Sequence, residues 1–256
     1  MQTIPFQQSR HRRFRSAARA IGVVSLAVAA GGFSAHAASP NLIANGDFET
    51  VPSGTTQSYQ ITPSNLPSWV PASGGINCLV FGGVNNMCGS SYHGPNGLMA
   101  TFATFPGVSP NGGNFLAADS DSHFVEPISQ VISGLVSGQK YSLSFYQAGV
   151  QQQGFTGPTT DQWQVTFGTA TQTSTLMSVP SGGAVGWNQQ TMTFTASAVS
   201  QTITFLAMGT PNADPPFILI DGISLTRVPE PASIALLSIG VLGLVGSRRR
   251  RALRTA

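Results

Sequence analysis

Short runs in which apolar and polar residues alternate fill the middle of this 256-residue sequence. The odd-numbered residues are Tyr, Leu and Phe in 141–145 and Trp, Val and Phe in 163–167, with serine, glutamine or threonine between them. Ranges 192–194 and 203–205 each place a threonine between two apolar residues. A period of two puts alternate side chains on opposite faces of a β-strand. The runs are separated by glycine, proline and asparagine, so we predict antiparallel strands of a sandwich or barrel.

The segment 217–225 differs because it is apolar at both parities. One expected face carries Phe217, Leu219, Ile223 and Leu225, and the other carries Ile218 and Ile220. A strand that is apolar on both faces is expected at the centre of a sheet. Asp221 falls on the first of these faces, where a buried carboxylate needs a cation or several hydrogen-bond donors.

Charge is distributed unevenly along the chain. Five arginines precede residue 20 and five follow residue 247. Between residues 40 and 228, Lys140 and Arg227 stand against eight carboxylates, a balance of −6. Binding to nucleic acid depends on basic side chains that neutralise phosphates, so this middle region excludes nucleic acid as a partner.

Residues 1–37 have the order of a secretory signal peptide. A basic stretch precedes the apolar run 20–33, and Ala35-His36-Ala37 supplies small residues for cleavage after Ala37 by signal peptidase. The adjacent arginines 12–13 raise the twin-arginine export route, although the residues around them fit that pattern poorly. An amphipathic helix is excluded because the apolar run has no polar face.

The other end of the chain carries a second apolar run. Residues 232–246 are uncharged, and they precede the consecutive arginines Arg248, Arg249, Arg250 and Arg251. A helix of this length spans ~22 Å, less than the ~30 Å hydrocarbon core of a bilayer. Arginines on one side would stay cytoplasmic and place the body outside. A core helix is excluded, because a run of arginines could not be buried.

These C-terminal features resemble the PEP-CTERM sorting signal of Gram-negative bacteria. The resemblance is carried by Val228-Pro229-Glu230-Pro231, the short apolar run and the arginine cluster. It implies recognition and cleavage near Pro229, Glu230 and Pro231 by an exosortase, a membrane cysteine protease. It also implies an inner-membrane intermediate, held only by this segment, and then a place on the cell surface, in the outer membrane or in an extracellular matrix. Such proteins usually accompany exopolysaccharide production.

The two terminal segments leave one domain between them. We expect a signal peptide at 1–37, a β-sandwich domain at 38–227 and a sorting signal with a single transmembrane helix at 228–256. Near the start of the domain, Asp47 and Glu49 point away from the apolar parity of the first expected strand. With Asp221 they could supply oxygen ligands to Ca²⁺, which takes six to eight of them. The alternative is that Asp47 and Glu49 are exposed edge residues.

The ends of the domain carry a second resemblance. The opening Asn41-Leu42-Ile43-x-Asn45-Gly46-x-Phe48-Glu49 and the closing Phe217-x-x-x-Asp221-Gly222-Ile223-Ser224-Leu225 resemble the galactose-binding-like jelly rolls, which include many carbohydrate-binding modules. The match is looser in 128–145 and poor in 51–113. It implies an all-β antiparallel sandwich with jelly-roll topology. Such domains often hold a structural calcium between their first and last strands, which adds support for Glu49 and Asp221 as ligands.

Cys78 and Cys88 are the cysteines of the chain, with nine residues between them in a glycine- and asparagine-rich stretch. In an exported protein this spacing predicts a disulfide, which would remove about 3 kcal/mol of chain entropy from the unfolded state. A metal-binding pair is the alternative, with His93 as the nearby histidine.

The densest polar cluster contains Asp119, Asp121, His123 and Glu126. Three interpretations stay open: a glycosidase acid–base pair, a second metal site, or a solvated loop. His93 and His123 are the histidines left after the signal peptide, and neither lies in a recognisable nucleophile motif. We therefore expect a protein that is not an enzyme.

Sugar binding needs exposed aromatic rings beside amide and carboxylate groups. Trp187 has the parity of polar residues, and Gln151, Gln153 and Phe155 belong to an expected polar loop. With Asp119 and Asp121 these residues form the candidate ligand set, and packing at the rim of the sandwich is the alternative for each. We expect non-catalytic binding of exopolysaccharide. A structural matrix protein without a small ligand, or a glycan hydrolase, are the other hypotheses.

Overall fold

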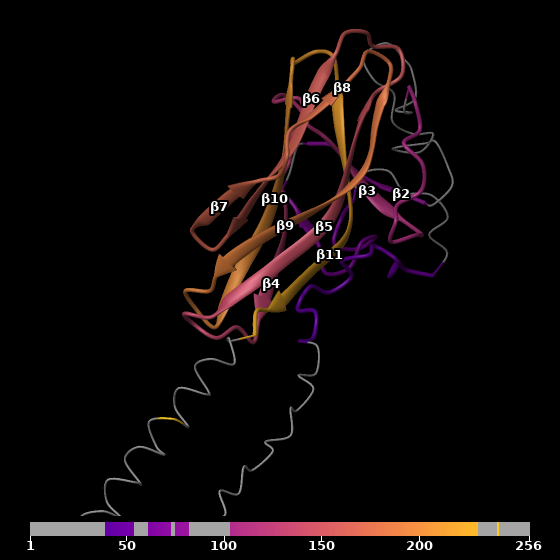
Figure 1. The fold of residues 1–256 in the computed structure, drawn as a ribbon. Coiled ribbons are helices and arrows are strands. Elements are labelled where there is room, and N and C mark those ends of the chain that lie inside the picture. The colour runs from indigo at the N-terminus through magenta and orange to yellow at the C-terminus, as the bar shows by residue number, and fades with distance from the viewer. Residues whose placement is uncertain (1–38, 54–60, 73–74, 82–102, 230–239, 241–256) are drawn as a thin grey trace, which may run out of the picture. The chain divides into compact units, whose positions relative to one another are not determined.

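The computed structural model describes residues 39–53, 61–72, 75–81, 103–229 and 240. Two antiparallel sheets pack face to face within them (Figure 1). The strands are β1 (Val70–Pro71), β2 (Asn77–Val80), β3 (Phe115–Asp119), β4 (Ile128–Ser133), β5 (Lys140–Gln151), β6 (Thr159–Phe167), β7 (Ala170–Thr173), β8 (Met177–Val179), β9 (Ala184–Thr195), β10 (Ser200–Thr210) and β11 (Pro216–Arg227). The expected signal peptide, and the sorting segment from Glu230 onward apart from Gly240, lie outside the described residues.

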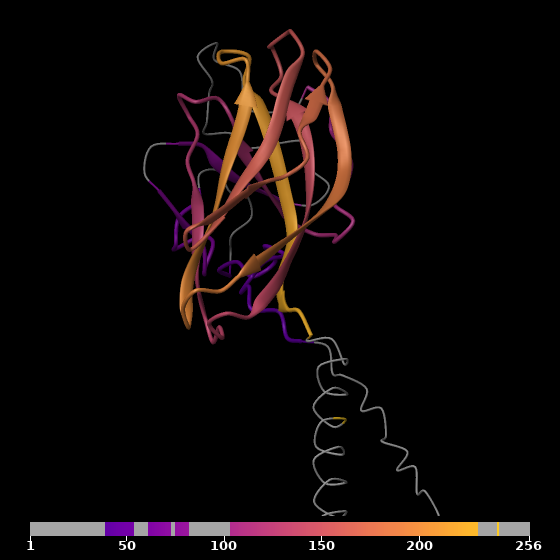
Figure 2. The same ribbon diagram turned by 60° about the vertical axis from the view of Figure 1, so that its left-hand side comes forward.

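The strand order confirms the predicted antiparallel sandwich of jelly-roll type. Sheet A has the order β2-β3-β11-β5-β9, and sheet B has the order β1-β4-β10-β6-β7, with β8 also paired to β6. The chain alternates between the sheets from β3 to β6 and again from β8 to β11: β3, β5, β9 and β11 lie in sheet A, while β4, β6, β8 and β10 lie in sheet B. Figure 2 shows the two layers from a second direction. Among the described residues, no helix is long and apolar enough to cross a membrane.

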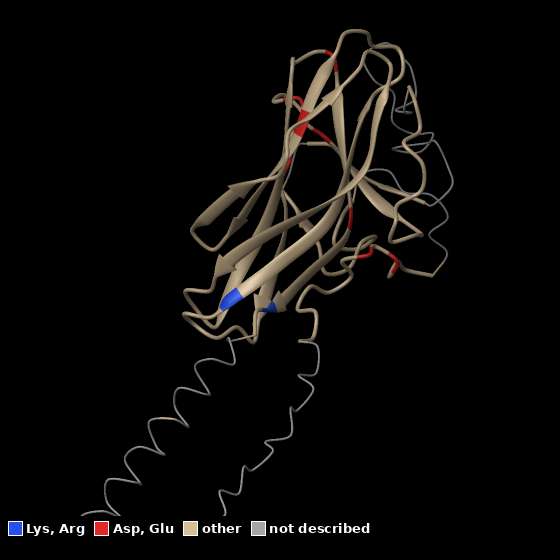
Figure 3. Cartoon of the chain, in the orientation of Figure 1, with Lys and Arg blue, Asp and Glu red and all other residues tan. Residues whose placement is uncertain are grey.

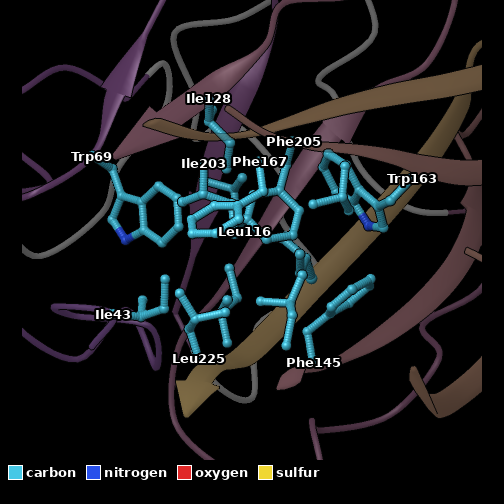
Figure 4. Packing of buried hydrophobic residues seen from close by; sticks show 14 of the residues in the cluster. Ile43, Trp69, Leu116, Ile128, Phe145, Trp163, Phe167, Ile203, Phe205 and Leu225 are labelled. Atoms are coloured by element: carbon cyan, nitrogen blue, oxygen red, sulfur yellow. The ribbon is translucent and has the colours of Figure 1, made fainter. Parts of the chain in front are cut away.

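The predicted alternation of buried and outward residues is confirmed in the central strands. The core between the sheets is built around Phe205, whose ring contacts those of Trp69, Phe145 and Trp163 at centroid distances of 6.0, 5.6 and 6.1 Å. All four side chains are fully buried (Figure 4). These rings come from both sheets and from the segment before β1, so they join the layers.

β11 lies between β3 and β5, the central position predicted for a strand that is apolar at both parities. The expected sharing of one face by Phe217, Leu219, Ile223 and Leu225 is wrong. Phe217 and Leu219 belong to a second apolar cluster on the outer face of sheet A, whereas Ile223 and Leu225 lie in the core. The register shifts between Asp221 and Ser224. A bulge adds a residue to one strand, and this one resets the parity of β11 beyond Asp221.

The second apolar cluster is covered by the chain segment before β3. Phe105 stacks on Phe115 of β3 at 6.4 Å. The segment is fastened to sheet A where the amide of Ala103 donates to the carbonyl of Gln151. Sheet A is therefore buried on both faces around β3 and β11, which explains the apolar character of these strands.

The two basic residues of the described strands lie at one end of the sandwich. Lys140 begins β5 and Arg227 ends β11, and these neighbouring positions form the basic end in Figure 3. In sheet B the strands carry a single charged residue, Asp161, in the described part of the chain. We call the end with Lys140 and Arg227 the basal end.

Candidate functional site

Four loops meet at the opposite end of the strands, and we call them the apical loops: 120–127, 152–158, 180–183 and 211–215. Hydrogen bonds join them in series. Asp121 Oδ2 accepts the amide of Ala213 at 2.6 Å, and the carbonyl of Pro215 accepts the amide of Gln152 at 3.3 Å. The amide of Gly157 donates to Ser181 Oγ at 2.9 Å. The loops therefore form one connected surface.

Asp119 and Asp121 support this surface from beneath. Both side chains are buried, so the interpretation of a solvated loop is wrong for them, although His123 is exposed. Asp121 Oδ1 accepts the amide of His123 at 2.9 Å and lies 2.7 Å from its ring Nδ1. Burial alone would raise the pKa of Asp121, but the hydrogen bonds from Ala213 and His123 hold it below its ordinary value. Asp121 thus acts as an internal anchor for two loops.

The glutamines expected in a polar loop differ in their placement. Gln151 is buried at the end of β5, where its Nε2 donates to the carbonyl of Gly157 at 3.0 Å and its Oε1 accepts the amide of Gly182 at 2.6 Å. Both of its polar atoms are committed to holding loops, so it is not available to a ligand. Gln153 is exposed and Phe155 is half-buried in loop 152–158.

Trp187 lies on the outer face of sheet A rather than in the core. Its ring is half-buried and meets Phe115 edge-on at 5.3 Å, and its Nε1 donates to the carbonyl of Gly107 at 3.0 Å. These contacts correspond to packing at the rim of the sandwich, which was the alternative interpretation of Trp187. The structure does not place Trp187 as an open platform for a sugar ring.

The apical loops expose groups that the sequence did not single out. Phe124 is 38% exposed, and its ring lies 6.4 Å from that of His123. Beside them, Ser122 and Asn212 pair through two hydrogen bonds, at 2.7 and 3.2 Å. No periodicity marks loop residues, so a sequence pattern could not have identified this juxtaposition.

Asp161 is a further residue that the sequence did not single out as a candidate. It lies on the inward face of β6 and is completely buried. Its parity is that of Trp163 and Val165, and this was the available signal: a carboxylate on an otherwise apolar face.

The opening motif forms a clamp on the last strand. Asn41 Oδ1 accepts the amides of Ile43 and Leu225, at 3.0 and 2.9 Å. Asn45, with a φ of 50°, binds both polar groups of Thr50 through its side chain. Asn41 therefore fixes the first segment against β11, and Asn45 holds the turn within that segment.

A polar hollow of about 280 Å³ lies between this first segment and the bulge of β11. Its lining residues are Asn41, Ile43, Asn45, Gly46, Asp47, Asn111, Gly222, Ile223 and Ser224. Close by, Glu49 Oε1 accepts the amide of Asn114. Asp47 and Glu49 are exposed, whereas Asp221 is buried. The structure therefore brings the three predicted calcium ligands to one region of the molecule.

The environment of Asp221 shows how close these charges are. Burial is the main cause that raises the pKa of Asp221 to about 7; hydrogen bonds from Ser109 and Gly222 oppose the rise, and the charges of Glu49 and Asp47 contribute to it. Asp221 Oδ2 has no hydrogen-bond partner among the described residues. An unpaired buried carboxylate oxygen near two more carboxylates has the chemistry of a calcium site.

The three carboxylates do not converge on one point in this conformation. In the described part of the chain, no group of three or more His, Cys, Asp or Glu side chains is arranged around a common metal position. Calcium also binds backbone carbonyls and water, so the donors fit the ion in kind. Calcium at Asp47, Glu49 and Asp221 stays a prediction.

Cys78 lies in β2 and is buried in the second apolar cluster. Cys88 lies outside the described residues, so the disulfide between them stays a prediction.

Residues 227–251 match the PEP-CTERM protein-sorting motif. The match includes the Pro229, Glu230 and Pro231 triplet and the four arginines 248–251, as the sequence predicted. This motif indicates an exported protein that is processed by an exosortase.

Solved structures with a similar fold include three carbohydrate-binding or adhesive domains. TmCBM61, in complex with β-1,4-galactotriose, is 15% identical, with a TM-score of 0.40, covering 74% of this chain and 100% of that one. The CBM22-1 xylan-binding domain of Xyn10C from Paenibacillus barcinonensis is 12% identical, with a TM-score of 0.37 and coverages of 76% and 98%. The K1 cleaved adhesin domain of Lys-gingipain from Porphyromonas gingivalis W83 is 11% identical, with a TM-score of 0.38 and coverages of 64% and 92%. No curated protein matches this sequence.

Proposed function

We propose that this exported domain binds a neutral polysaccharide without cleaving it, through the apical loops, on the surface or in the matrix of a Gram-negative cell. One observation carries the proposal. The apical loops expose the ring of Phe124 beside the paired Ser122 and Asn212, on a frame braced by buried hydrogen bonds. Pyranose rings have apolar faces and hydroxyl edges, and this combination of groups is complementary to both.

The charge of the domain favours a neutral ligand. Between residues 40 and 228 the balance is −6, and the two cations lie at the basal end. This excess of negative charge would repel an acidic polysaccharide, whereas it would not repel the uncharged hydroxyl groups of a neutral one.

Burial of the apical carboxylates supports binding rather than hydrolysis. Glycosidases use two carboxyl groups that flank the scissile bond, about 5–10 Å apart. Asp119, Asp121 and Glu126 are each no more than 2% exposed, and both oxygens of Asp121 accept hydrogen bonds from the backbone. None of the three is placed to touch a bound glycan.

Calcium is part of the proposal as a structural ion. Asp47, Glu49 and Asp221 would hold it, and its charge would offset three carboxylates that have no Lys or Arg nearby in the part of the chain that the structure describes. Its place between the first segment and β11 would tie the two ends of the domain together, away from the apical loops.

Affinity electrophoresis of the processed protein tests the proposal. Native gels would contain a neutral galactan, xylan or glucan, or the exopolysaccharide of the host itself. We expect retardation by at least one of them, and absence of retardation by all of them would refute glycan binding.

A Phe124→Ala variant connects retardation to the apical loops. Loss of the ring should weaken binding roughly threefold to tenfold. The matched control is Val199→Ala, which removes an exposed apolar side chain (70% exposed) from the loop between β9 and β10, at the basal end. Equal weakening in both variants would place the site elsewhere.

A structural matrix protein is the second candidate, and the outer face of sheet B favours it. Ser129, Thr204, Thr166 and Thr171 form one row of hydroxyl groups across β4, β10, β6 and β7. Asp161 is the charged residue of these strands and it faces inward, so the described outer face is neutral. A neutral, hydroxyl-rich sheet face could pack against the same face of another copy of the protein without charge repulsion. Concentration-dependent sedimentation that is unaffected by any sugar would support this candidate.

A further inference from the structure

A buried bridge between the two sheets lies directly beneath the apical loops. Its centre is Ser120, the first residue after β3 of sheet A. The Ser120 hydroxyl contacts Asp161 Oδ1 on β6 of sheet B, and it also lies 2.9 Å from the carbonyl oxygen of Pro216 on β11. Ser120, Asp161 and Pro216 are all buried.

The backbone of Ser120 strengthens the same connection. Its amide donates to the carbonyl of Pro216 at 3.0 Å, and its carbonyl accepts the amide of Gly209 on β10 at 3.0 Å. A side chain at position 209 would come within 2.4 Å of Ser120 Oγ, so only glycine fits there. The bridge thus joins the start of loop 120–127 to both ends of loop 211–215.

Hydrogen counting indicates the protonation state of the bridge. A serine hydroxyl has one hydrogen to donate, yet Ser120 Oγ is close to two acceptor oxygens, Asp161 Oδ1 and Pro216 O. Both contacts can be hydrogen bonds together only when Asp161 supplies a hydrogen of its own. A neutral Asp161 would donate to Ser120 Oγ, which would then donate to Pro216.

The surroundings of Asp161 also favour the neutral acid. Its Oδ2 has no hydrogen-bond partner within the described ranges. Its strand partners are Met177 on β8 and Gly209 on β10, and Gly149 on β5 lies close to its Oδ2; none of these residues titrates. Asp119 is the carboxylate that acts on it, and Lys140 and Arg227 lie at the basal end. Burial raises the pKa of Asp161 to about 8, with Asp119 adding to the rise and the Ser120 hydroxyl opposing it.

The other apical ionisable groups have other neighbours, and the buried Glu126 lies against Gly75. Asp121 and His123 bind each other, and the charge of Asp121 acts on Asp119. Asp214 approaches Gly157 in the neighbouring loop. No described cation is therefore placed to stabilise an ionised Asp161.

We propose that Asp161 is a positioning residue that ties the two sheets together as a neutral acid, and that loss of its proton in alkaline solution releases the apical loops and weakens ligand binding. The effect on the ligand rests on the proposed function, whereas the release of the loops does not. On ionisation the Ser120 hydroxyl turns to the carboxylate, and the Pro216 carbonyl keeps the hydrogen bond from the Ser120 amide but loses the one from its hydroxyl. A buried anion without a cation then favours opening of this end.

Amide hydrogen exchange of the full exported protein between pH 6 and 9.5 tests the release. The reporters are the amides of Gly209 and Ala213, which are hydrogen-bonded in and above the bridge, and the basal amide of Gly138 is the internal reference. After correction for intrinsic rates, protection of the two reporters should fall by up to tenfold per pH unit up to about pH 8 and level off above it, as one linked proton requires. Protection of Gly138 should stay constant.

Two variants distinguish release of the bridge from a general loosening of the protein at alkaline pH. Asp161→Asn mimics the neutral acid, because its amide can donate to Ser120 at every pH, and it should remove the fall in protection. Ser120→Ala should lower protection of both reporters already at pH 6. The matched control is Asp214→Asn, which removes an apical carboxylate outside the bridge and should behave like the wild type. An unchanged pH profile in Asp161→Asn would overturn the proposal.

Affinity electrophoresis at pH 7 and pH 9 completes the design. Retardation that weakens at pH 9 in the wild type but not in Asp161→Asn supports control of binding by the bridge. Retardation with the same pH dependence in both proteins overturns that control while leaving glycan binding intact. If no polysaccharide retards either protein, the proposed function fails, and hydrogen exchange alone decides whether the bridge releases the loops.

Discussion

Gln130 holds both backbone polar groups of Ala44: its Oε1 accepts the amide at 2.8 Å, and its Nε2 donates to the carbonyl oxygen at 2.9 Å. The same Nε2 lies 3.1 Å from the carbonyl of Ser68. The side chain of Gln130 on β4 thus makes the backbone hydrogen bonds that a paired strand would make with Ala44. It fastens the opening motif to sheet B. The irregular first segment owes its fixed path to this glutamine as well as to Asn41.

Replacing this glutamine should destabilise the domain. Gln130→Ala removes the partly buried hydrogen bonds to the backbone of Ala44 and Ser68, at about 1–2 kcal/mol, or a fall of about 2–8 °C in Tm. Thermal unfolding by circular dichroism measures the change. Gln162→Ala on the outer face of sheet B is the matched control and should shift Tm little. A comparable loss in both variants would mean that the contacts with Ala44 contribute no stability of their own.

Removal of calcium should lower Tm. A chelator would leave Asp47, Glu49 and Asp221 without a counter-charge, so the free energy of unfolding should fall, and added Ca²⁺ should restore it. Asp221→Asn should make Tm insensitive to chelator. A Tm that does not respond to chelator in the wild type would remove calcium from this site.

Without calcium, stability should increase as the solution becomes mildly acidic. Burial raises the pKa of Asp119 and Asp221 to about 7 and that of Asp161 to about 8, from an ordinary value of 3.8. The folded state therefore binds more protons than the unfolded chain between about pH 4 and 8, and the free energy of unfolding falls as pH rises through that window. Below it, the lowered pKa of Asp121 acts in the opposite direction.

Thermal unfolding in chelator at pH 5, 6.5, 8 and 9 checks this prediction. Tm should be highest near pH 5, fall up to pH 8, and then change little. A maximum of Tm at pH 8 would show that the buried carboxylates are ionised in the folded protein.

The aromatic centre of the core should be intolerant of a smaller side chain. Phe205→Leu removes a ring that meets three others, at a cost of about 1–3 kcal/mol. Urea denaturation gives the difference in the free energy of unfolding. Phe124→Leu, at a partly exposed ring of the apical loops, should cost much less. Similar losses would contradict the central place of Phe205.

Much of the sandwich could be predicted because its strands follow one simple rule. In the runs 141–145 of β5, 163–167 of β6 and 203–205 of β10 each inward residue is apolar and each outward residue is polar, so period two appears directly in the sequence. The terminal motifs and the central place of β11 also follow from residue types. These features depend on residues that are close together in the sequence, so the sequence alone shows them.

The parts that could not be predicted depend on contacts across the fold. The bulge after Asp221 moves the following residues of β11 to the opposite faces of the sheet. Gly222 adopts a φ of 60° there, but a glycine in a sequence does not by itself indicate a bulge. Trp187 has an outward parity, but a segment some 80 residues earlier covers it. The sequence predicts Gln151 as a loop residue, but in the structure its side chain binds two loops. In each case a distant partner decides the role of the residue.

The position of β11 also has a consequence for the order in which the protein is assembled. Without residues 216–227, sheet A consists of two separate pairs, β2–β3 and β5–β9, with no strand to join them. A growing or translocating chain delivers β11 after all the other strands. Sheet A therefore cannot be completed until β11, the last strand in the sequence, is available to pair with both β3 and β5.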